Sequence, residues 1–98
     1  MDNKIILEWD EAKRRQNLAE RGIDFIDAID VFSDPNMCLY LDERMNYGEE
    51  RFNAYGVSKD RNLRVCFTPR NGKFRIITMF NVHKKEWSKR YVTNKSYS

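Results

Sequence analysis

Residues 51–80 have the sequence RFNAYGVSKDRNLRVCFTPRNGKFRIITMF, and this stretch determines most of the fold of the 98-residue chain. Three runs rich in apolar, β-branched and aromatic residues, Arg51–Val57, Leu63–Thr68 and Phe74–Phe80, are separated by short polar connections, which predicts three consecutive strands. The second connection contains Asn71-Gly72, a dipeptide that favours a tight hairpin because both residues tolerate a positive φ. The pattern therefore predicts an antiparallel meander.

The middle run of the meander predicts one apolar and one mixed face, because successive side chains of a strand point to opposite sides of the sheet. We expect the core face to receive Leu63, Val65 and Phe67, and the mixed face to receive Arg64, Cys66 and Thr68.

On the N-terminal side of the meander, the short apolar run Lys4–Glu8 predicts a first strand. Asp10 is placed to cap a helix that begins at Glu11 and ends at about Glu20 or Arg21. Gly22 fits the left-handed position that follows the last helical turn. The spacing predicts a strand followed at once by a capped helix.

A second helix is predicted to begin at Asp24, and Asp34-Pro35 ends it. A short apolar run, Met37–Leu41, then predicts a strand before the meander. The helix assignment rests on apolar residues that recur at helical spacing on one side, namely Phe25, Ala28, Ile29 and Phe32.

The end of the chain, His83–Tyr91, predicts a short basic helix. Trp87 and Tyr91 are four residues apart on one side of it, which is more typical of packing than of chemistry. Together these elements predict a single domain over residues 1–98 of the α+β class, with two N-terminal helices and a C-terminal helix around a mainly antiparallel twisted sheet.

The charges are divided unevenly along the chain. Residues 1–58 carry 7 Lys and Arg against 13 Asp and Glu, a net charge of −6, whereas residues 59–98 carry 11 against 2, a net charge of +9. Asymmetry of this kind favours a face that binds a polyanion. An ordinary solvated surface gives the same composition, and the acidic half could also neutralise the basic half within the fold.

Cys38 and Cys66 are the only cysteines, and both lie in apolar runs without the spacing of metal ligands. We expect two buried thiols and no disulfide. The apolar run near the N-terminus is too short for a secretion signal, and no segment approaches membrane-spanning length. The sequence therefore predicts a cytoplasmic protein without membrane contact.

The composition excludes several hydrolase classes. The chain has one histidine, no cluster of metal-ligand residues, no glycine-rich phosphate loop and no Ser-His-Asp set, so we expect neither a metal nor a cofactor. What remains is a surface of basic and aromatic side chains, which suits single-stranded RNA because guanidinium groups pair with phosphates and rings stack unpaired bases. The candidates for RNA contacts are Arg64, Arg70, Lys85 and Tyr55.

RNA can be cleaved without a metal when its own 2′-OH attacks the adjacent phosphate, provided that side chains move the protons and cations stabilise the charged intermediate. A histidine is suited to proton transfer near neutral pH, although His83 could instead cap the last helix and Glu50 could be a surface ion-pair partner. The candidates for catalysis are Arg51 and Arg75 as stabilising cations, His83 as the proton-transfer group, and Glu50 and Lys84 as assisting groups.

Short motifs follow one another in a recognisable order along nearly the whole chain. They are Glu8-Trp9-Asp10, Lys13, Asn17, Gly22, Phe25, Ala28, Val31-Phe32, Asp34-Pro35, Glu49-Glu50-Arg51-Phe52, Gly56, Thr68, Arg70, Arg75-Ile76-Ile77, Lys84-Lys85-Glu86 and Tyr91. This pattern resembles the BrnT family of ribonuclease toxins. The resemblance implies a compact RelE-like fold, metal-independent RNA cleavage, and inhibition by a BrnA-like antitoxin whose ribbon-helix-helix part binds operator DNA, so that DNA is reached only through the antitoxin.

The chain departs from the family pattern at three places. Thr78, Met79 and Phe80 stand where the family usually has Ser-Ala-Arg, so an expected active-site arginine is missing. Arg21 stands where the family usually has histidine, and it cannot shuttle a proton because guanidinium does not deprotonate in proteins. His83 replaces the usual threonine before the basic run and could compensate.

Two other functions stay open. A toxin-like binding module, which acts with its antitoxin in operon repression and no longer cuts RNA, is favoured by Phe80. A DNA-binding regulator would use the first two helices as a helix-turn-helix pair, but the acidic side chains of Asp24, Asp27 and Asp30 would repel phosphates.

Overall fold

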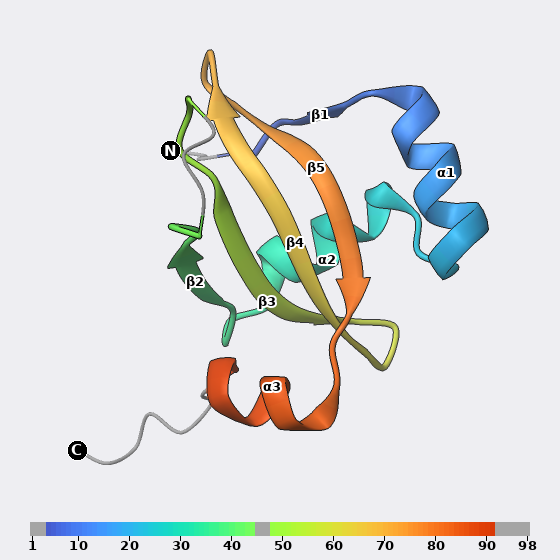
Figure 1. The fold of residues 1–98 in the computed structure, drawn as a ribbon, viewed down its shortest axis with the longest axis vertical. Helices are drawn as coiled ribbons and strands as arrows, with labels where there is room; N and C mark the ends of the chain where they lie inside the picture. Colours follow the sequence, from blue (N-terminus) through green and yellow to red (C-terminus); the bar gives the residue numbers. More distant parts are fainter. Residues whose placement is uncertain (1–3, 45–47, 92–98) are drawn as a thin grey trace.

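The computed structural model describes residues 4–44 and 48–91. The predicted α+β class is confirmed, since three α-helices lie beside one sheet in this part of the chain (Figure 1). In chain order the elements are β1 (Leu7–Trp9), α1 (Glu11–Arg21), the 3-10 helix η1 (Phe25–Asp27), α2 (Ala28–Ser33), β2 (Cys38–Leu41), β3 (Phe52–Ser58), β4 (Arg61–Arg70), β5 (Lys73–Asn81) and α3 (Lys84–Arg90).

The five strands form one sheet in the order β1-β5-β4-β3-β2. The meander predicted for residues 51–80 is confirmed, because β3, β4 and β5 pair as successive antiparallel neighbours and β2 joins β3 in the same sense. β1 instead lies parallel to β5, so the sheet is mixed. The parallel pair requires a long crossover, which the chain provides by passing through the helices and the meander between its first and last strands.

Both hairpins close with two-residue turns. The φ angles are 51° and 65° at Lys59-Asp60, and 53° and 78° at Asn71-Gly72. Positive φ at both central residues gives a turn whose twist matches that of the flanking strands. The first connection is shorter than the predicted stretch Ser58–Asn62. Lys59 and Arg61 hold it against η1, because both bind the buried carboxylate of Asp27, at 3.0 and 2.7 Å.

The first strand lies further along the chain than the predicted run Lys4–Glu8. Its position is set by β5, because the residues of β1 pair with Phe74, Arg75 and Ile76. The helix that follows has the predicted ends. Asp10 accepts a hydrogen bond from the backbone N–H of Ala12 at 2.9 Å, and Gly22 adopts a φ of 71°.

The predicted second helix is divided into η1 and α2. Asp24 caps η1 by accepting from the backbone N–H of Ile26. η1 has three residues per turn, fewer than an α-helix, so the side of this segment that faces the core differs from the side that a continuous α-helix would turn inward. As a result, Phe25, Ala28 and Val31 are fully buried. Ile29, which the helical spacing placed on the buried side, is 52% exposed.

α2 packs directly on β3, on the face of the sheet that carries the core (Figure 1). A Cβ atom added at Gly56 would lie 2.9 Å from Cγ1 of Val31 and 3.0 Å from its carbonyl oxygen. The absence of a side chain at this position therefore allows the close approach of helix and strand. Leu63, Val65 and Phe67 are buried on this face, as the alternation predicts.

A β-bulge interrupts β5. The pairing with β4 passes from Cys66–Thr78 to Phe67–Ile76, which leaves Ile77 as the extra residue. Ile76 and Met79 both belong to the buried core although they are three residues apart. Beyond the bulge the alternation is reversed, so that Arg75, Thr78 and Phe80 share the opposite face.

Cys38 and Cys66 are thiols and do not form a disulfide, and only Cys66 is buried. Cys38 is partly exposed because β2 is the edge strand of the sheet. Among the helices of residues 4–44 and 48–91, none has the length and apolar character needed to cross a membrane.

Candidate nucleic-acid interface

The face of the sheet opposite α2 carries three of the nine predicted site residues, Arg75, Arg64 and Tyr55, in three rows that run across the strands. We call it the basic face. The first row contains Glu8, Arg75 and Thr68, the second Thr78, Cys66, Asn53 and Tyr40, and the third Phe80, Arg64, Tyr55 and Cys38. Successive rows are two residues, about 7 Å, apart along the strands.

The first row is held by a carboxylate and a threonine. An ion pair of 3.5 Å joins Arg75 to Glu8, its pairing partner in β1, and leaves the Arg75 side chain 32% exposed. Thr68 donates from its hydroxyl to the backbone carbonyl of Glu50 at 2.6 Å, which brings the segment before β3 to the level of this row. The side chain of Glu50 is exposed and forms no ion pair among the described residues.

Arg51 and Arg70 converge on one carboxylate at this end of the sheet. Glu49 binds Arg70 at 3.2 Å and Arg51 at 3.3 Å, and these two guanidinium groups lower the pKa of its carboxyl. Arg51 and Arg64 also act electrostatically on the thiol of Cys66, and both favour a lower pKa of that thiol. Burial is the main reason why the pKa of that thiol is raised.

The third row is joined to α3 by Glu86. This carboxylate accepts from the hydroxyl of Tyr55 at 2.6 Å and from Arg64 at 2.9 Å. The two donors lower the pKa of Glu86, while burial and the hydrogen bond to Glu86 raise the pKa of Tyr55. Two of the predicted RNA contacts thus lie in one hydrogen-bonded cluster.

α3 is anchored over the end of the basic face. Tyr40 donates from its hydroxyl to the carbonyl of Arg90 at 2.8 Å, and the Arg90 guanidinium lies 4.7 Å from the centroid of the Tyr40 ring. Tyr91 donates to Asp34 at 2.7 Å, and burial together with this hydrogen bond raises the pKa of Tyr91 to about 12. Trp87 stacks on Tyr91 with ring centroids 4.1 Å apart, which confirms the predicted packing role.

The first turn of α3 presents exposed cations. His83 occupies the N-cap position but makes no side-chain cap hydrogen bond, so the alternative role of a capping side chain is not observed. Lys84 and Lys85 are exposed and form no ion pair within the described part of the chain. These three side chains are available to an anion.

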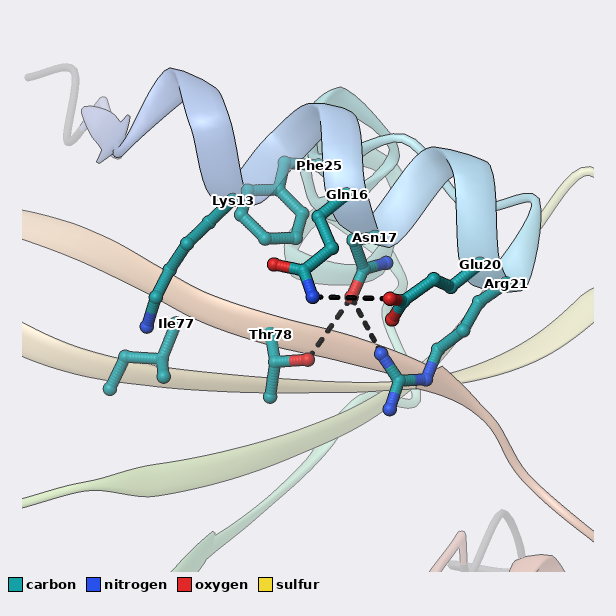
Figure 2. A pocket seen from close by; sticks show the side chains of 8 residues that line it. All are labelled: Lys13, Gln16, Asn17, Glu20, Arg21, Phe25, Ile77 and Thr78. Carbon is teal, nitrogen blue, oxygen red and sulfur yellow. Dashed lines mark hydrogen bonds between the residues drawn. The ribbon is translucent and has the colours of Figure 1, made fainter.

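A pocket of about 320 Å³ lies where α1 borders the bulge of β5. Figure 2 shows Lys13, Asn17 and Arg21 extending from α1 toward Ile77 and Thr78 of β5. The buried amide oxygen of Asn17 accepts from the Thr78 hydroxyl at 3.1 Å and from Arg21 at 3.3 Å. Asn17 therefore fixes α1 against the edge of the basic face.

Arg21 and Phe80, two of the positions at which the sequence departs from the pattern it resembles, are in contact. The guanidinium carbon of Arg21 lies 4.5 Å from the centroid of the Phe80 ring, and that of Arg64 lies 4.4 Å from it. A guanidinium group is thus present beside position 80 although the strand does not supply it.

A second pocket, of about 350 Å³, opens at the other side of the basic face, beside β2. Sequence reasoning did not select most of its residues, because they are brought together by the packing of α3 on β2. Its lining is Tyr40, Leu41, Asp42, Glu43, Arg44, Asn53, Tyr55, Arg64 and Arg90.

The structure separates the predicted catalytic residues into two groups. Arg51, Glu50 and Arg75 lie at the first row, whereas His83 and Lys84 follow the far end of β5. Arg75 and Asn81 are six residues apart on one strand, which corresponds to about 20 Å. One phosphate cannot contact both groups.

Within the described residues, no group of three or more His, Cys, Asp or Glu side chains is arranged to hold a metal ion.

Known proteins provide an independent comparison. No curated protein matches the chain. A family model described as the ribonuclease toxin BrnT of type II toxin-antitoxin systems matches residues 9–86, which is most of the chain. The chain therefore belongs to the BrnT family of ribonuclease toxins of type II toxin-antitoxin systems.

Proposed function

We propose that this BrnT protein cleaves single-stranded RNA in the cytoplasm, without a metal, on the basic face of its sheet. The ribose 2′-oxygen attacks the adjacent phosphorus, the bond from phosphorus to the 5′-oxygen breaks, and the products end in a 2′,3′-cyclic phosphate and a 5′-hydroxyl. The protein has to accept the proton of the 2′-OH, protonate the departing 5′-oxygen and stabilise the charged phosphorane.

One observation carries this proposal: the bulge in β5 places Arg75 and Phe80 on the same face as Arg64 and Tyr55. Guanidinium groups and an aromatic ring then lie along a surface that spans three rows, or about 13 Å between the outer ones. A single strand of RNA can follow such a surface with its phosphates on the arginines. A RelE-like relationship of the fold belongs to the same proposal, supported by the mainly antiparallel sheet.

We place the reaction centre at the first row. Arg75 and Arg51 would stabilise the phosphorane there. Glu50, exposed and without an ion pair among the described residues, would accept the 2′-OH proton and, once protonated, pass it to the departing 5′-oxygen. His83 and Lys84 would then hold the RNA strand further along. The reverse assignment, with His83 transferring the proton beside Arg64, uses the other end of the same face.

Cleavage rates of three variants between pH 5 and 8 decide between these two ends. Arg75→Ala should lower the rate 10²- to 10³-fold, equivalent to roughly 3–4 kcal/mol, because a charge-stabilising donor is lost. His83→Gln should weaken RNA binding without changing the shape of the pH profile. If His83→Gln changed the shape of the pH profile while Arg75→Ala cleaved at the parent rate, the first-row assignment would be wrong. Lys59→Ala, which alters a cation outside the basic face, is the matched control.

A binding module without catalytic activity is the alternative, and Phe80 is the observation that favours it. The contact between Arg21 and Phe80 weakens that alternative, because a guanidinium is still present at this place. Expression in a bacterial host separates the two functions. An active ribonuclease arrests growth, whereas an inactive module does not.

The antitoxin partner follows from membership of the family, and we propose that it is BrnA-like, with a ribbon-helix-helix part that binds operator DNA. The toxin would then reach DNA only through this partner. Co-expression of the neighbouring gene product should relieve growth arrest. The purified pair, but not the toxin alone, should retard operator DNA in a gel.

A further inference from the structure

Two residues that line the pocket beside β2 carry buried polar groups without a partner among residues 4–44 and 48–91. The carboxamide oxygen of Asn53 and the Nε–H group of Arg64 are buried, and neither forms a hydrogen bond within the described part of the chain. Both residues line this pocket of about 350 Å³. Leaving a buried acceptor and a buried donor unsatisfied costs free energy, so such groups call for a specific explanation.

The walls of the pocket are aromatic and cationic, and they are held in place. Tyr40 and Tyr55 meet edge to face with ring centroids 5.7 Å apart. The Arg90 guanidinium covers the Tyr40 ring, and the Tyr40 hydroxyl holds the Arg90 carbonyl. Tyr55 is only 3% exposed, so the surface open to a base is that of the partly exposed Tyr40 ring and the exposed Arg90 guanidinium, a kind of surface on which unpaired bases stack.

The one buried carboxylate in the pocket does not oppose an anionic ligand. Asp42 has a side chain only 1% exposed and accepts from Nε and Nη2 of Arg44, each at 2.9 Å. These hydrogen bonds lower its pKa, so that it stays ionised and paired. The Arg44 side chain is 67% exposed, which leaves much of this cation at the pocket mouth.

From these contacts we infer that the pocket beside β2 binds one unstacked nucleobase of the RNA strand and selects among bases through Asn53. The inference rests on the proposed function, since it concerns the RNA that lies on the basic face. Asn53 stands in the second row, between Cys66 and Tyr40, so a base leaving the strand there enters the pocket directly. The amide supplies both a donor and an acceptor for a base edge, and Arg64 supplies a second donor.

Binding of RNA analogues that cannot be cleaved tests the inference without requiring activity. The probes are decamers of abasic residues that lack 2′-OH groups and carry one central 2′-fluoro nucleotide with A, C, G or U, together with a decamer without any base. Fluorescence anisotropy gives the affinity of each. We expect one base to bind about tenfold more tightly than another, as hydrogen-bonded and stacked bases do.

Variants assign this preference to the pocket. Asn53→Ala should remove the preference among the four bases, and Asn53→Asp, which keeps the size of the side chain, should change which base is preferred. Asn62→Ala, on β4 outside the pocket, should leave the preference intact. Arg75→Ala should weaken all five decamers by a similar factor, because it acts on phosphate alone.

The inference is overturned if the parent protein binds all five decamers within about twofold of each other, or if both Asn53 variants keep the parent preference. Failure of the proposed function gives a different result. In that case natural RNA stays intact with the purified protein, while the preference for one base in the uncleavable decamers is unaffected.

Discussion

Asn17 shows how a single side chain connects a helix to a sheet edge. It is 3% exposed, its amide nitrogen donates to the carbonyl of Ile23 at 3.1 Å, and its oxygen accepts from Thr78 and from the backbone N–H of Met79. Asn17→Ala should lower the free energy of unfolding by about 1–3 kcal/mol, because buried donors and an acceptor lose their partner. Urea denaturation measures this change. Asn81→Ala, at an exposed position, should change stability by less than about 0.5 kcal/mol.

Asp42 makes stability depend on pH in the acid range. Its pKa in the folded protein is below the unfolded value because Arg44 donates to the carboxylate. The stabilisation is therefore fully present above the unfolded pKa, about 3.9, and is lost as the pH falls through the lower folded pKa. Asp42→Asn should be less stable than the parent at pH 7, and the difference should shrink below about pH 4, with a slope of at most about 1.4 kcal/mol per pH unit. Urea titrations from pH 3 to 7 would reveal it, and a constant difference would be inconsistent with this role.

Helix α2 and strand β3 approach each other most closely at Gly56. Gly56→Ala places a Cβ atom against Cγ1 of Val31 and against its backbone oxygen. We expect a loss of about 1–3 kcal/mol, because overpacking displaces the helix. The double variant with Val31→Ala should recover only part of the loss, since the backbone contact remains. Thermal denaturation of both variants tests this, and full recovery would place the conflict in the side chain alone.

The elements that depend on neighbouring residues in the chain could be predicted from the sequence. Asp10 and Gly22 mark the ends of α1, and Asn71-Gly72 marks a hairpin, because capping and turn geometry are set within a few residues. The bulge at Ile77 could not be predicted in this way. It depends on the register between β4 and β5 and on the contact with α1, both of which are tertiary.

The two oppositely charged halves of the sequence meet in the folded molecule. Carboxylates of the acidic half pair with cations of the basic half, as Glu8 does with Arg75, Glu49 with Arg70 and Asp27 with Arg61. The neutralisation considered from the sequence therefore takes place in part. The exposed cations at the start of α3 form no such pairs within the described residues, so we expect them to contribute strongly to RNA affinity.

Salt dependence separates these two kinds of cation. Lys85→Ala should reduce the slope of log affinity against log salt by about 0.7, the value for one phosphate contact with a single strand. Lys59→Ala should leave the slope unchanged, because Lys59 is bound to Asp27 at 3.0 Å. Anisotropy titrations of an uncleavable single strand give both slopes, and equal slopes in the two variants would refute the assignment to α3.

The candidate site was only partly predictable from the sequence. The composition indicated arginines and aromatic residues as RNA contacts. The alternation of residues in the middle strand placed Arg64 on the face away from the core, which is the basic face of the structure. The pocket beside β2 is lined by Tyr40, Arg90 and Asn53 because α3 docks on β2. No short stretch of the sequence predicts this docking. The distance between Arg75 and His83 likewise follows from the length of β5 in the folded sheet.

We propose that this BrnT protein cuts RNA by itself without a metal. Incubation of the purified chain with total RNA in EDTA, followed by analysis of the new ends, tests this claim beside Arg75→Ala and the antitoxin-bound protein. We predict fragments that end in 2′,3′-cyclic phosphate, lost in both controls. RNA that stays intact under all conditions would contradict the claim and favour the module without catalytic activity.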